Sequence, residues 1–139
     1  MICPNCGLDE VITTNSRPTH KMTRRWRRRK CLKCGFIFTT HEIIDLSHIT
    51  VIKKDGRKVR FSREKLYSGI YHIVVEEKGI DRGDAGVLAN NITQEIEKEI
   101  ILSRRQNLKT KEIKKLVLGY LKPRYKNHYL RYLAYFGSN

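Results

Sequence analysis

Four cysteines, arranged as two Cys-x-x-Cys pairs within the first 34 residues, constrain this 139-residue chain more than any other feature. Cys3 and Cys6 form the first pair, and Cys31 and Cys34 form the second. Each pair is followed by a glycine, and such turns bring two thiolates to one tetrahedral ion while nearby backbone N–H groups support the sulfur charge. Four thiolates fill the coordination shell. The spacing therefore predicts one structural Zn²⁺ per chain, with iron as the alternative metal.

Two other roles for the cysteines agree less well with the sequence. The N-terminus "MICPNC" has no apolar stretch of signal-peptide length, and no run of about 18 apolar residues indicates a membrane span. We therefore expect a cytoplasmic protein with reduced thiols rather than disulfides. A redox Cys-x-x-Cys pair normally opens a helix in a thioredoxin-like βαβ pattern, which is not visible here. His20 and His41 lie outside the cysteine spacing and are expected to be polar surface residues.

The composition changes near residue 48. All four cysteines, the only tryptophan and the densest basic run precede this point, whereas the long apolar periodicities follow it. We expect two domains, over residues 1–48 and 49–139, with a short connection because no Gly/Ser-rich linker separates them. The first domain cannot obtain its folding free energy from an apolar core, so metal binding would have to supply it.

Short strands are predicted in the first domain and a hairpin followed by helices in the second, an α+β fold. The strand candidates are "EVITT", "RRWRRRK" and "FIFTT", and the hairpin turns at Asp55-Gly56. Ser62 is the expected cap of the first helix, and Asp84 of the second. Leu88, Ile92, Ile96 and Ile100 recur every four residues, which indicates a helix with a buried stripe. A third helix is expected from Thr110 to a stop at Pro123, and a fourth over "NHYLRYLAYF".

The basic run between the cysteine pairs suggests a polyanion as partner. The chain has 29 basic and 14 acidic residues, a formal net charge of +15, and residues 20–33 hold eight Lys or Arg and no acid. Side chains of a strand alternate between faces, so Arg25, Arg27 and Arg29 share one side and Arg24, Trp26 and Arg28 the other. Such arginines suit phosphate contacts and guanine edges. The alternative is a solvated charged surface that binds no partner. These residues do not distinguish DNA from RNA as the partner.

A second cationic feature lies on the predicted hairpin. Lys53 and Lys54 precede its turn, and Lys65 lies in the first turn of the following helix. Lysines that converge beside a helix N-terminus make a phosphate site without a Walker loop, and no G-x-x-x-x-G-K-[ST] or G-x-G-x-x-G motif occurs. The alternative is the ordinary surface of a basic protein.

Four segments, in their order and spacing, resemble the NrdR family of transcriptional repressors of ribonucleotide reductase genes: "CPNC", "NSRP", "RRWRRRKCLKCGFIFTTHE" and "VIKKDGRKVRFSREKL". The resemblance extends from residue 3 to about 136. It implies a zinc ribbon that binds double-stranded operator DNA, followed by an ATP-cone in which a β-hairpin lies on a four-helix bundle. It also implies ATP or dATP as effectors that change the state of a homo-oligomer, and no membrane association.

The resemblance also implies roles for individual residues. The nucleotide-binding candidates are Val51, Lys53, Lys54, Lys65, Thr110 and Lys114. The DNA-binding candidates are Arg17, Arg24, Arg25, Trp26, Arg27, Arg28, Arg29 and Lys30. Arg131 matches an arginine in the family's "Y-V-R-F" ending. The chain departs from the family pattern at Lys54, where arginine is usual, at Val59, where an acid is usual, and at Ser62, where Asp or Asn is usual.

Other functions and placements stay open at this point. A zinc-ribbon nucleic-acid accessory factor without nucleotide sensing is the alternative function. An enzyme is not expected, because the thiols are assigned to a metal and no Ser/His/Asp or paired-carboxylate arrangement is present. The C-terminal aromatic residues belong either to the core or to a subunit interface: Tyr125, Tyr129, Tyr132, Tyr135 and Phe136.

Overall fold

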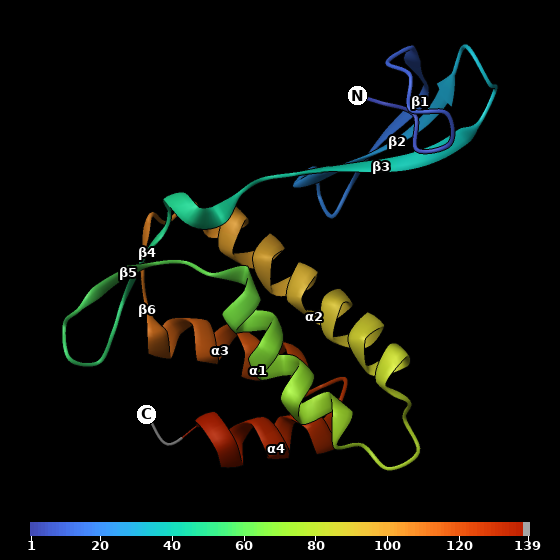
Figure 1. The fold of residues 1–139 in the computed structure, drawn as a ribbon. Helices are drawn as coiled ribbons and strands as arrows, with labels where there is room; N and C mark the ends of the chain where they lie inside the picture. Colours follow the sequence, from blue (N-terminus) through green and yellow to red (C-terminus); the bar gives the residue numbers. More distant parts are fainter. Residues whose placement is uncertain (138–139) are drawn as a thin grey trace. The chain divides into compact units, whose positions relative to one another are not determined.

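The computed structural model describes residues 1–137, and the chain divides into two compact units (Figure 1). The first unit is Met1–Ile44 and the second begins at Asp45, so the division lies slightly before the expected boundary at residue 48. No helix in the described part of the chain is both long and apolar enough to cross a membrane.

The first unit is a three-stranded antiparallel sheet with β2 in the middle. Its strands are β1 (Val11–Thr19), β2 (Arg24–Cys31) and β3 (Ile37–Ile43). All three predicted strands are confirmed, although β1 is longer than "EVITT" and contains a bulge between Thr13 and Asn15. The basic run therefore forms the central strand, and each of its side chains has neighbours on both sides.

The second unit contains a small mixed sheet of β4 (Thr50–Ile52), β5 (Lys58–Arg60) and β6 (Asn107–Lys109), preceded by the short helix η1 (Leu46–His48). The predicted hairpin β4–β5 is confirmed, with Gly56 in its turn at a φ of 84°. The third strand, β6, pairs with β4 in parallel and was not predicted. Three residues are too few to show an alternating pattern. This pairing places the end of β6 beside the end of β4.

Four helices follow the hairpin: α1 (Arg63–Val75), α2 (Arg82–Ser103), α3 (Thr110–Leu121) and α4 (Lys126–Phe136). The predicted cap of α1 is confirmed, because the Ser62 side chain accepts a hydrogen bond from the backbone of Lys65. The predicted cap of α2 was wrong. Asp81 caps this helix by accepting the backbone N–H of Asp84 at 2.9 Å, so Asp84 lies within the first turn. The start of α3 at Thr110 is confirmed, and the helix ends before Pro123.

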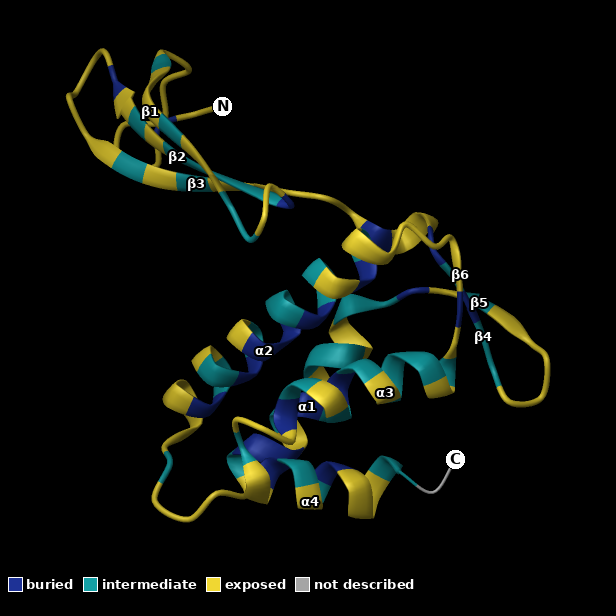
Figure 2. Cartoon of the chain, turned by 180° about the vertical axis from the view of Figure 1, so that it is seen from behind, coloured by how far each residue is buried: buried dark blue, intermediate teal, exposed yellow. Residues whose placement is uncertain are grey.

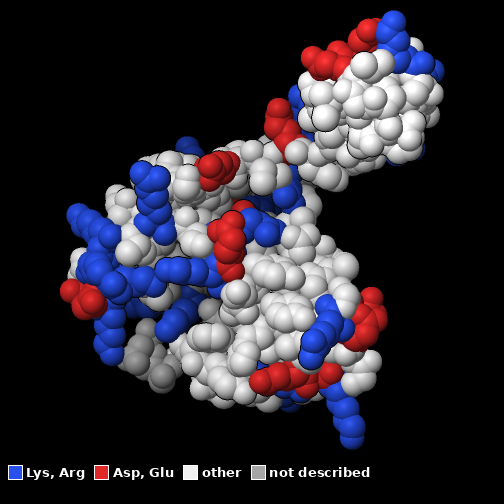
Figure 3. All heavy atoms as spheres, in the orientation of Figure 1, with Lys and Arg blue, Asp and Glu red and all other residues white. Residues whose placement is uncertain are grey.

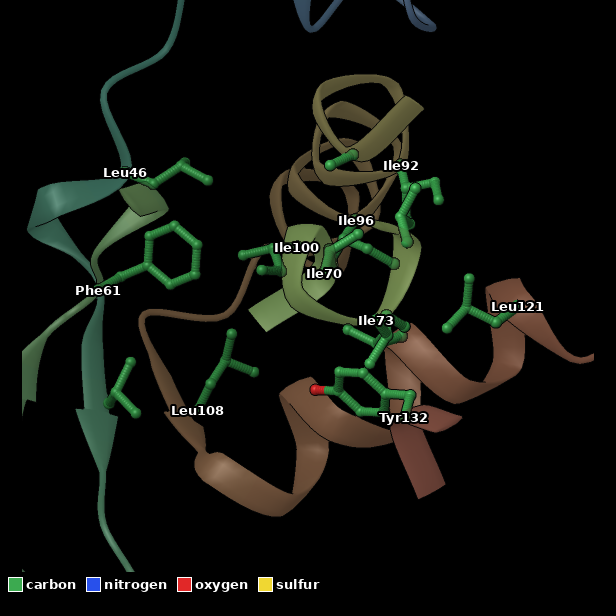
Figure 4. Close-up of a cluster of buried hydrophobic side chains, with 14 of the residues drawn as sticks. Leu46, Phe61, Ile70, Ile73, Ile92, Ile96, Ile100, Leu108, Leu121 and Tyr132 are labelled. Atoms are coloured by element: carbon green, nitrogen blue, oxygen red, sulfur yellow. The ribbon is translucent and has the colours of Figure 1, made fainter. Parts of the chain in front are cut away.

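The helices and the sheet of the second unit enclose one hydrophobic core (Figure 4). Ile92, Ile96 and Ile100 are at most 1% exposed, which confirms these three positions of the predicted stripe of α2, whereas Leu88 is only partly buried against the core. Helix α1 packs against both α2 and α4, and buried residues follow the sides of α1 and α2 that face each other (Figure 2). Burying each such side chain contributes about 1.5–3 kcal/mol, so the second unit has a sufficient core of its own.

The C-terminal aromatic residues divide between core and surface. Tyr132 is buried in the core, and three others pack partly against it: Tyr125, Tyr129 and Phe136. Tyr135 is 53% exposed, and its hydroxyl donates a hydrogen bond to Glu76 at 2.9 Å.

His128 is an unusual member of this region because it is buried without full hydrogen bonding. Only 3% of it is exposed, and its Nδ1 has no partner within the described residues. Its Nε2 lies 3.4 Å from a carboxylate oxygen of Glu77. Burial lowers the pKa of His128, helped by the charge of Arg131 and opposed by Glu77. The folded chain therefore holds this proton less tightly than the unfolded chain does.

We expect His128→Phe to reduce the loss of stability of the second unit in acid. The unfolded state takes up the extra proton, so stability falls as the pH drops below the unfolded histidine pKa of about 6.5. The measurement is the thermal midpoint of the helical circular-dichroism signal at about pH 5 and pH 7.5. His72→Gln is the control, since His72 is exposed. Equal acid-induced decreases in the wild type and the His128 variant would contradict this assignment.

Candidate metal centre and binding surfaces

The two Cys-x-x-Cys segments form turns with matching backbone geometry. The Gly7 N–H donates to the Cys3 carbonyl, and the Gly35 N–H donates to the Cys31 carbonyl, both at 2.9 Å. Both glycines have a φ of 76°, in the left-handed region where residues with a side chain are strained. The glycine after each cysteine pair is therefore required by the turn.

These turns bring the four sulfur atoms together. All four lie within 4.8 Å of one another, and the Cys3–Cys34 and Cys6–Cys31 sulfur pairs are each 3.6 Å apart. A tetrahedral zinc ion with Zn–S bonds of about 2.3 Å requires sulfur separations of about 3.8 Å. The sulfur positions fit that ion and are much too far apart for disulfide bonds. Neither His20 nor His41 belongs to the cluster, and His41 is exposed as expected.

Asn5 supports the cluster from within the first turn. Its backbone N–H donates to the Cys3 sulfur at 3.4 Å, and its side-chain amide donates to the Cys34 sulfur at 3.6 Å. The Asn5 amide and the Phe36 backbone N–H lower the pKa of Cys34 to about 6. These donors stabilise thiolate, which is the form that binds a metal.

The arginines of β2 are held in place by hydroxyl groups on the neighbouring strands. On one face of the sheet, Arg25 donates to the Ser16 hydroxyl at 3.0 Å and Arg29 donates to the Thr40 hydroxyl at 2.7 Å. Arg27, between them, lies 3.6 Å from a carboxylate oxygen of Glu42. Hydroxyl groups fix the positions of Arg25 and Arg29 without neutralising them, so their charges are available to an anion.

Trp26 and further cations occupy the opposite face of the same sheet. Trp26 pairs with Arg17 on β1, and the Arg17 guanidinium carbon lies 5.5 Å from the centre of the indole ring. Arg28 donates to the Thr39 hydroxyl at 3.1 Å. Arg24 and Lys30 alternate onto this face as well. The zinc ribbon therefore presents cations on both faces, and Trp26 supports one of them by a cation–π contact.

In the second unit, a pocket of about 240 Å³ collects most of the nucleotide-binding candidates. Val51, Lys53, Lys65, Thr110 and Lys114 all line it, although they come from three separate parts of the chain. Hydrophobic and aromatic side chains form much of the rest of its wall: Val59, Phe61, Leu66, Ile113, Tyr132 and Phe136. Arg60, Ser62 and Gly69 complete the lining. We call this cavity the inner pocket.

An outer pocket of about 1070 Å³ adjoins the inner one and shares Lys53, Thr110 and Lys114 with it. Lys54 lines only this outer pocket. The side chains of Lys and Arg gather over the β4–β5 hairpin, as Figure 3 shows. Three cations of this pocket were not among the predicted site residues: Arg57, Lys109 and Lys111. The run "LKTK" around Thr110 could have indicated two of these cations, Lys109 and Lys111. Only the β4–β6 pairing, which was not predicted, places this run beside the hairpin.

The N-terminus of α3 faces this shared region. Thr110 is the first residue of α3, and its hydroxyl donates to the Ile52 carbonyl at 3.4 Å, which ties the helix start to the end of β4. Unpaired N–H groups and the helix dipole favour an anion at such a terminus. By contrast Arg131 donates to the Ile73 carbonyl at 3.4 Å and so contacts α1.

Comparisons with known proteins agree with both units. Residues 1–42 match the family described as transcriptional repressor NrdR-like, N-terminal domain, and residues 49–136 match the ATP cone domain. The transcriptional repressor NrdR of Caldicellulosiruptor bescii is 36% identical over 96% of this chain and 84% of its own length. The Microcystis aeruginosa protein of that name is 35% identical over 99% of this chain and 78% of its own length.

The fold and the comparisons define a zinc-ribbon protein with an ATP cone, and its relatives are regulators rather than enzymes. The chain belongs to the NrdR family of transcriptional repressors.

We expect Asn5→Ala to weaken zinc binding by about 10-fold, within the range seen when a group that hydrogen-bonds a metal ligand is removed. Competition with a chromophoric chelator would measure the zinc affinity. The control is Asn127→Ala on the exposed side of α4. An Asn5 variant with wild-type zinc affinity would show that its two N–H···S contacts do not support the metal.

Proposed function

We propose that this chain is a zinc-dependent, DNA-binding repressor of ribonucleotide reductase genes that responds to ATP and dATP. The observation that carries the proposal is the inner pocket, where an apolar wall adjoins lysines from the hairpin, α1 and α3. A nucleotide has the same division into an apolar base and an anionic phosphate chain. The arginines on the zinc ribbon supply the matching DNA surface.

In the proposed nucleotide complex, the base lies in the inner pocket against Val51. The phosphates lie where the two pockets meet, near Lys53, Lys114 and the N-terminus of α3. Lys65 approaches from the first turn of α1, and Lys54 from the outer pocket. Lysine supplies charge without the paired hydrogen bonds of arginine, so Lys54 acts as a point charge on a terminal phosphate.

In the proposed DNA complex, the central strand of the zinc ribbon lies against the duplex. Arg25, Arg27 and Arg29 contact phosphates or guanine edges from one face, and Arg17, Arg24, Arg28 and Lys30 add positive charge from the other. Trp26 holds Arg17 in position. The four-thiolate metal site maintains the turns at the ends of these strands.

The two halves have separate proposed tasks. Residues 1–48 bind DNA as a zinc ribbon, and residues 49–139 sense nucleotides as a hairpin on a four-helix bundle. ATP and dATP shift the cytoplasmic protein between homo-oligomers that differ in operator affinity, which couples nucleotide supply to transcription.

Gel-shift titrations with operator DNA test the sensing step. We expect the wild type to bind DNA with different affinities in ATP and in dATP, because only oligomers of suitable geometry engage paired sites. Lys53→Ala should lower the affinity for both nucleotides about tenfold by removing a phosphate contact, whereas Lys58→Ala, outside both pockets, should not. DNA binding that is identical with and without either nucleotide would favour a zinc-ribbon factor without sensing.

The DNA-binding surface is tested separately. We expect Arg25→Ala to weaken DNA binding and to reduce the slope of log affinity against log salt concentration by about one, because one phosphate contact is lost. Zinc content and nucleotide affinity should be unchanged. Lys78→Ala, which removes an exposed charge in the second unit, is the matched control. If both variants show the same small effect, binding depends on overall charge and not on the strand.

A further inference from the structure

The turn between β1 and β2 has a strained backbone. His20, Lys21 and Met22 have φ angles of 49°, 51° and 69°, so three consecutive residues with side chains adopt the left-handed conformation. In the described part of the chain, the only other residue with a side chain and a positive φ is Arg104, at the end of α2. Glycine would adopt these angles without strain. The turn therefore keeps side chains where glycine would be more favourable, and strained residues of this kind concentrate at functional sites.

This turn, residues 20–23, forms a closed tip beyond the end of the sheet, and we call it the hairpin tip. The pairing of β1 with β2 ends at Thr19 and Arg24, and the turn projects away from the strands (Figure 1). Thr23 closes the turn, because its backbone N–H and its hydroxyl donate to the His20 carbonyl at 3.1 and 2.7 Å. These bonds fix the backbone, so the exposed side chains of the tip are presented from a rigid turn.

The hairpin tip combines an exposed apolar side chain with a positively charged one. Met22 is 76% exposed, the largest exposed fraction of any large hydrophobic side chain among the described residues. Lys21 is exposed beside it. No Asp or Glu occurs in the sequence between Glu10 and Glu42, and two arginines follow the tip directly. The tip therefore favours a polyanion that also offers an apolar surface.

Duplex DNA offers this combination in its minor groove. The minor groove is about 6 Å wide, much narrower than the major groove that admits a helix or a two-stranded ribbon. Its floor is formed by base edges, and phosphates line its two sides. Proteins that enter it use lysine or arginine together with apolar side chains, methionine among them, that insert between base pairs. Met22 and Lys21 supply both kinds of side chain from one turn.

We propose that the hairpin tip enters the minor groove of the bound duplex, where Met22 wedges into a base step and Lys21 contacts a phosphate. This inference rests on the proposed DNA-binding function and gives the tip a task separate from that of the β2 arginines. A wedge of this kind partly unstacks the step and bends the duplex toward the major groove by about 20–90°. Pyrimidine–purine steps unstack most easily, so the tip favours TA or CA/TG at that position.

Energy transfer between dyes on the two ends of a duplex tests the wedge. The duplex is one that the full, zinc-loaded wild-type chain selects from random-sequence DNA. We expect wild-type binding to raise the energy transfer, because the duplex bends. Met22→Ala should bind about tenfold more weakly and lose most of that rise, because alanine keeps the same backbone strain but is too short to unstack the bases.

The matched control is Leu32→Ala, which shortens a 58% exposed side chain in the second cysteine turn, at the other end of β2. It should bind and bend the duplex as the wild type does. Lys21→Ala should reduce the slope of log affinity against log salt concentration by about one, whereas Met22→Ala should leave the slope unchanged because methionine carries no charge.

A change confined to the minor groove identifies where Met22 binds. Diaminopurine in place of adenine adds an amino group to the minor groove and leaves the major-groove edge of the base unchanged. Each adenine of the selected duplex is replaced in turn. At the insertion step, we expect the replacement to weaken wild-type binding about tenfold and to leave Met22→Ala unaffected, because the variant does not insert there.

Three results would overturn the proposal: wild-type affinity and bending in the Met22 variant, no bending by the wild type, or equal sensitivity of both proteins to diaminopurine. Loss of zinc from Met22→Ala would show that the side chain has a structural role and would also overturn it. If Arg25→Ala weakens DNA binding and Met22→Ala does not, this inference alone is lost. If the wild type selects no duplex, the proposed function fails as well.

Discussion

Coordination of one metal ion by four thiolates is the interaction on which the first unit depends. Among its residues only Cys3, Thr23 and Cys31 are buried. A three-stranded sheet with so little buried apolar surface cannot offset the conformational entropy of its chain, nor the mutual repulsion of five arginines on one strand. Metal binding supplies that free energy and at the same time closes the turns that set the ends of β1, β2 and β3.

The second unit differs from the first, because its hydrophobic core is sufficient for folding without a metal. Its candidate nucleotide site, however, is assembled from segments that are far apart in the sequence. The parallel pairing of β4 and β6 aligns Ile52 with Lys109, so that Thr110 begins α3 beside the hairpin. Without that pairing, α3 would not begin beside the hairpin, and Lys114 would not line the same cavity as the hairpin lysines. This three-residue strand thus determines most of the site geometry, and its central residue, Leu108, is buried in the core.

The features predicted best from the sequence are those encoded locally. The Cys-x-x-Cys spacing, the cap at Ser62 and the four-residue repeat of α2 each depend on neighbours within a few positions, and the structure confirms all three. The cap of α2 was misplaced because Asp81 and Asp84 both lie at suitable positions, and only the backbone geometry distinguishes them. The β6 strand and the cations around Thr110 were missed because they depend on pairing between segments far apart in the sequence. The DNA and nucleotide roles of individual residues came from family resemblance, and local physics alone left them open.

The hydrogen bond from Thr110 to Ile52 spans 58 residues of the chain and is long, at 3.4 Å. A triphosphate bound at this junction, as proposed, would contact the hairpin, α1 and α3 simultaneously. It would therefore link three segments that are far apart in the sequence. Ligand binding to the folded state alone stabilises a protein by about 2.7 kcal/mol when the ligand concentration is 100 times its Kd. The resistance of this unit to proteases in the cell would then rise and fall with the nucleotide pool, so that turnover of the repressor follows the same signal as its binding to DNA.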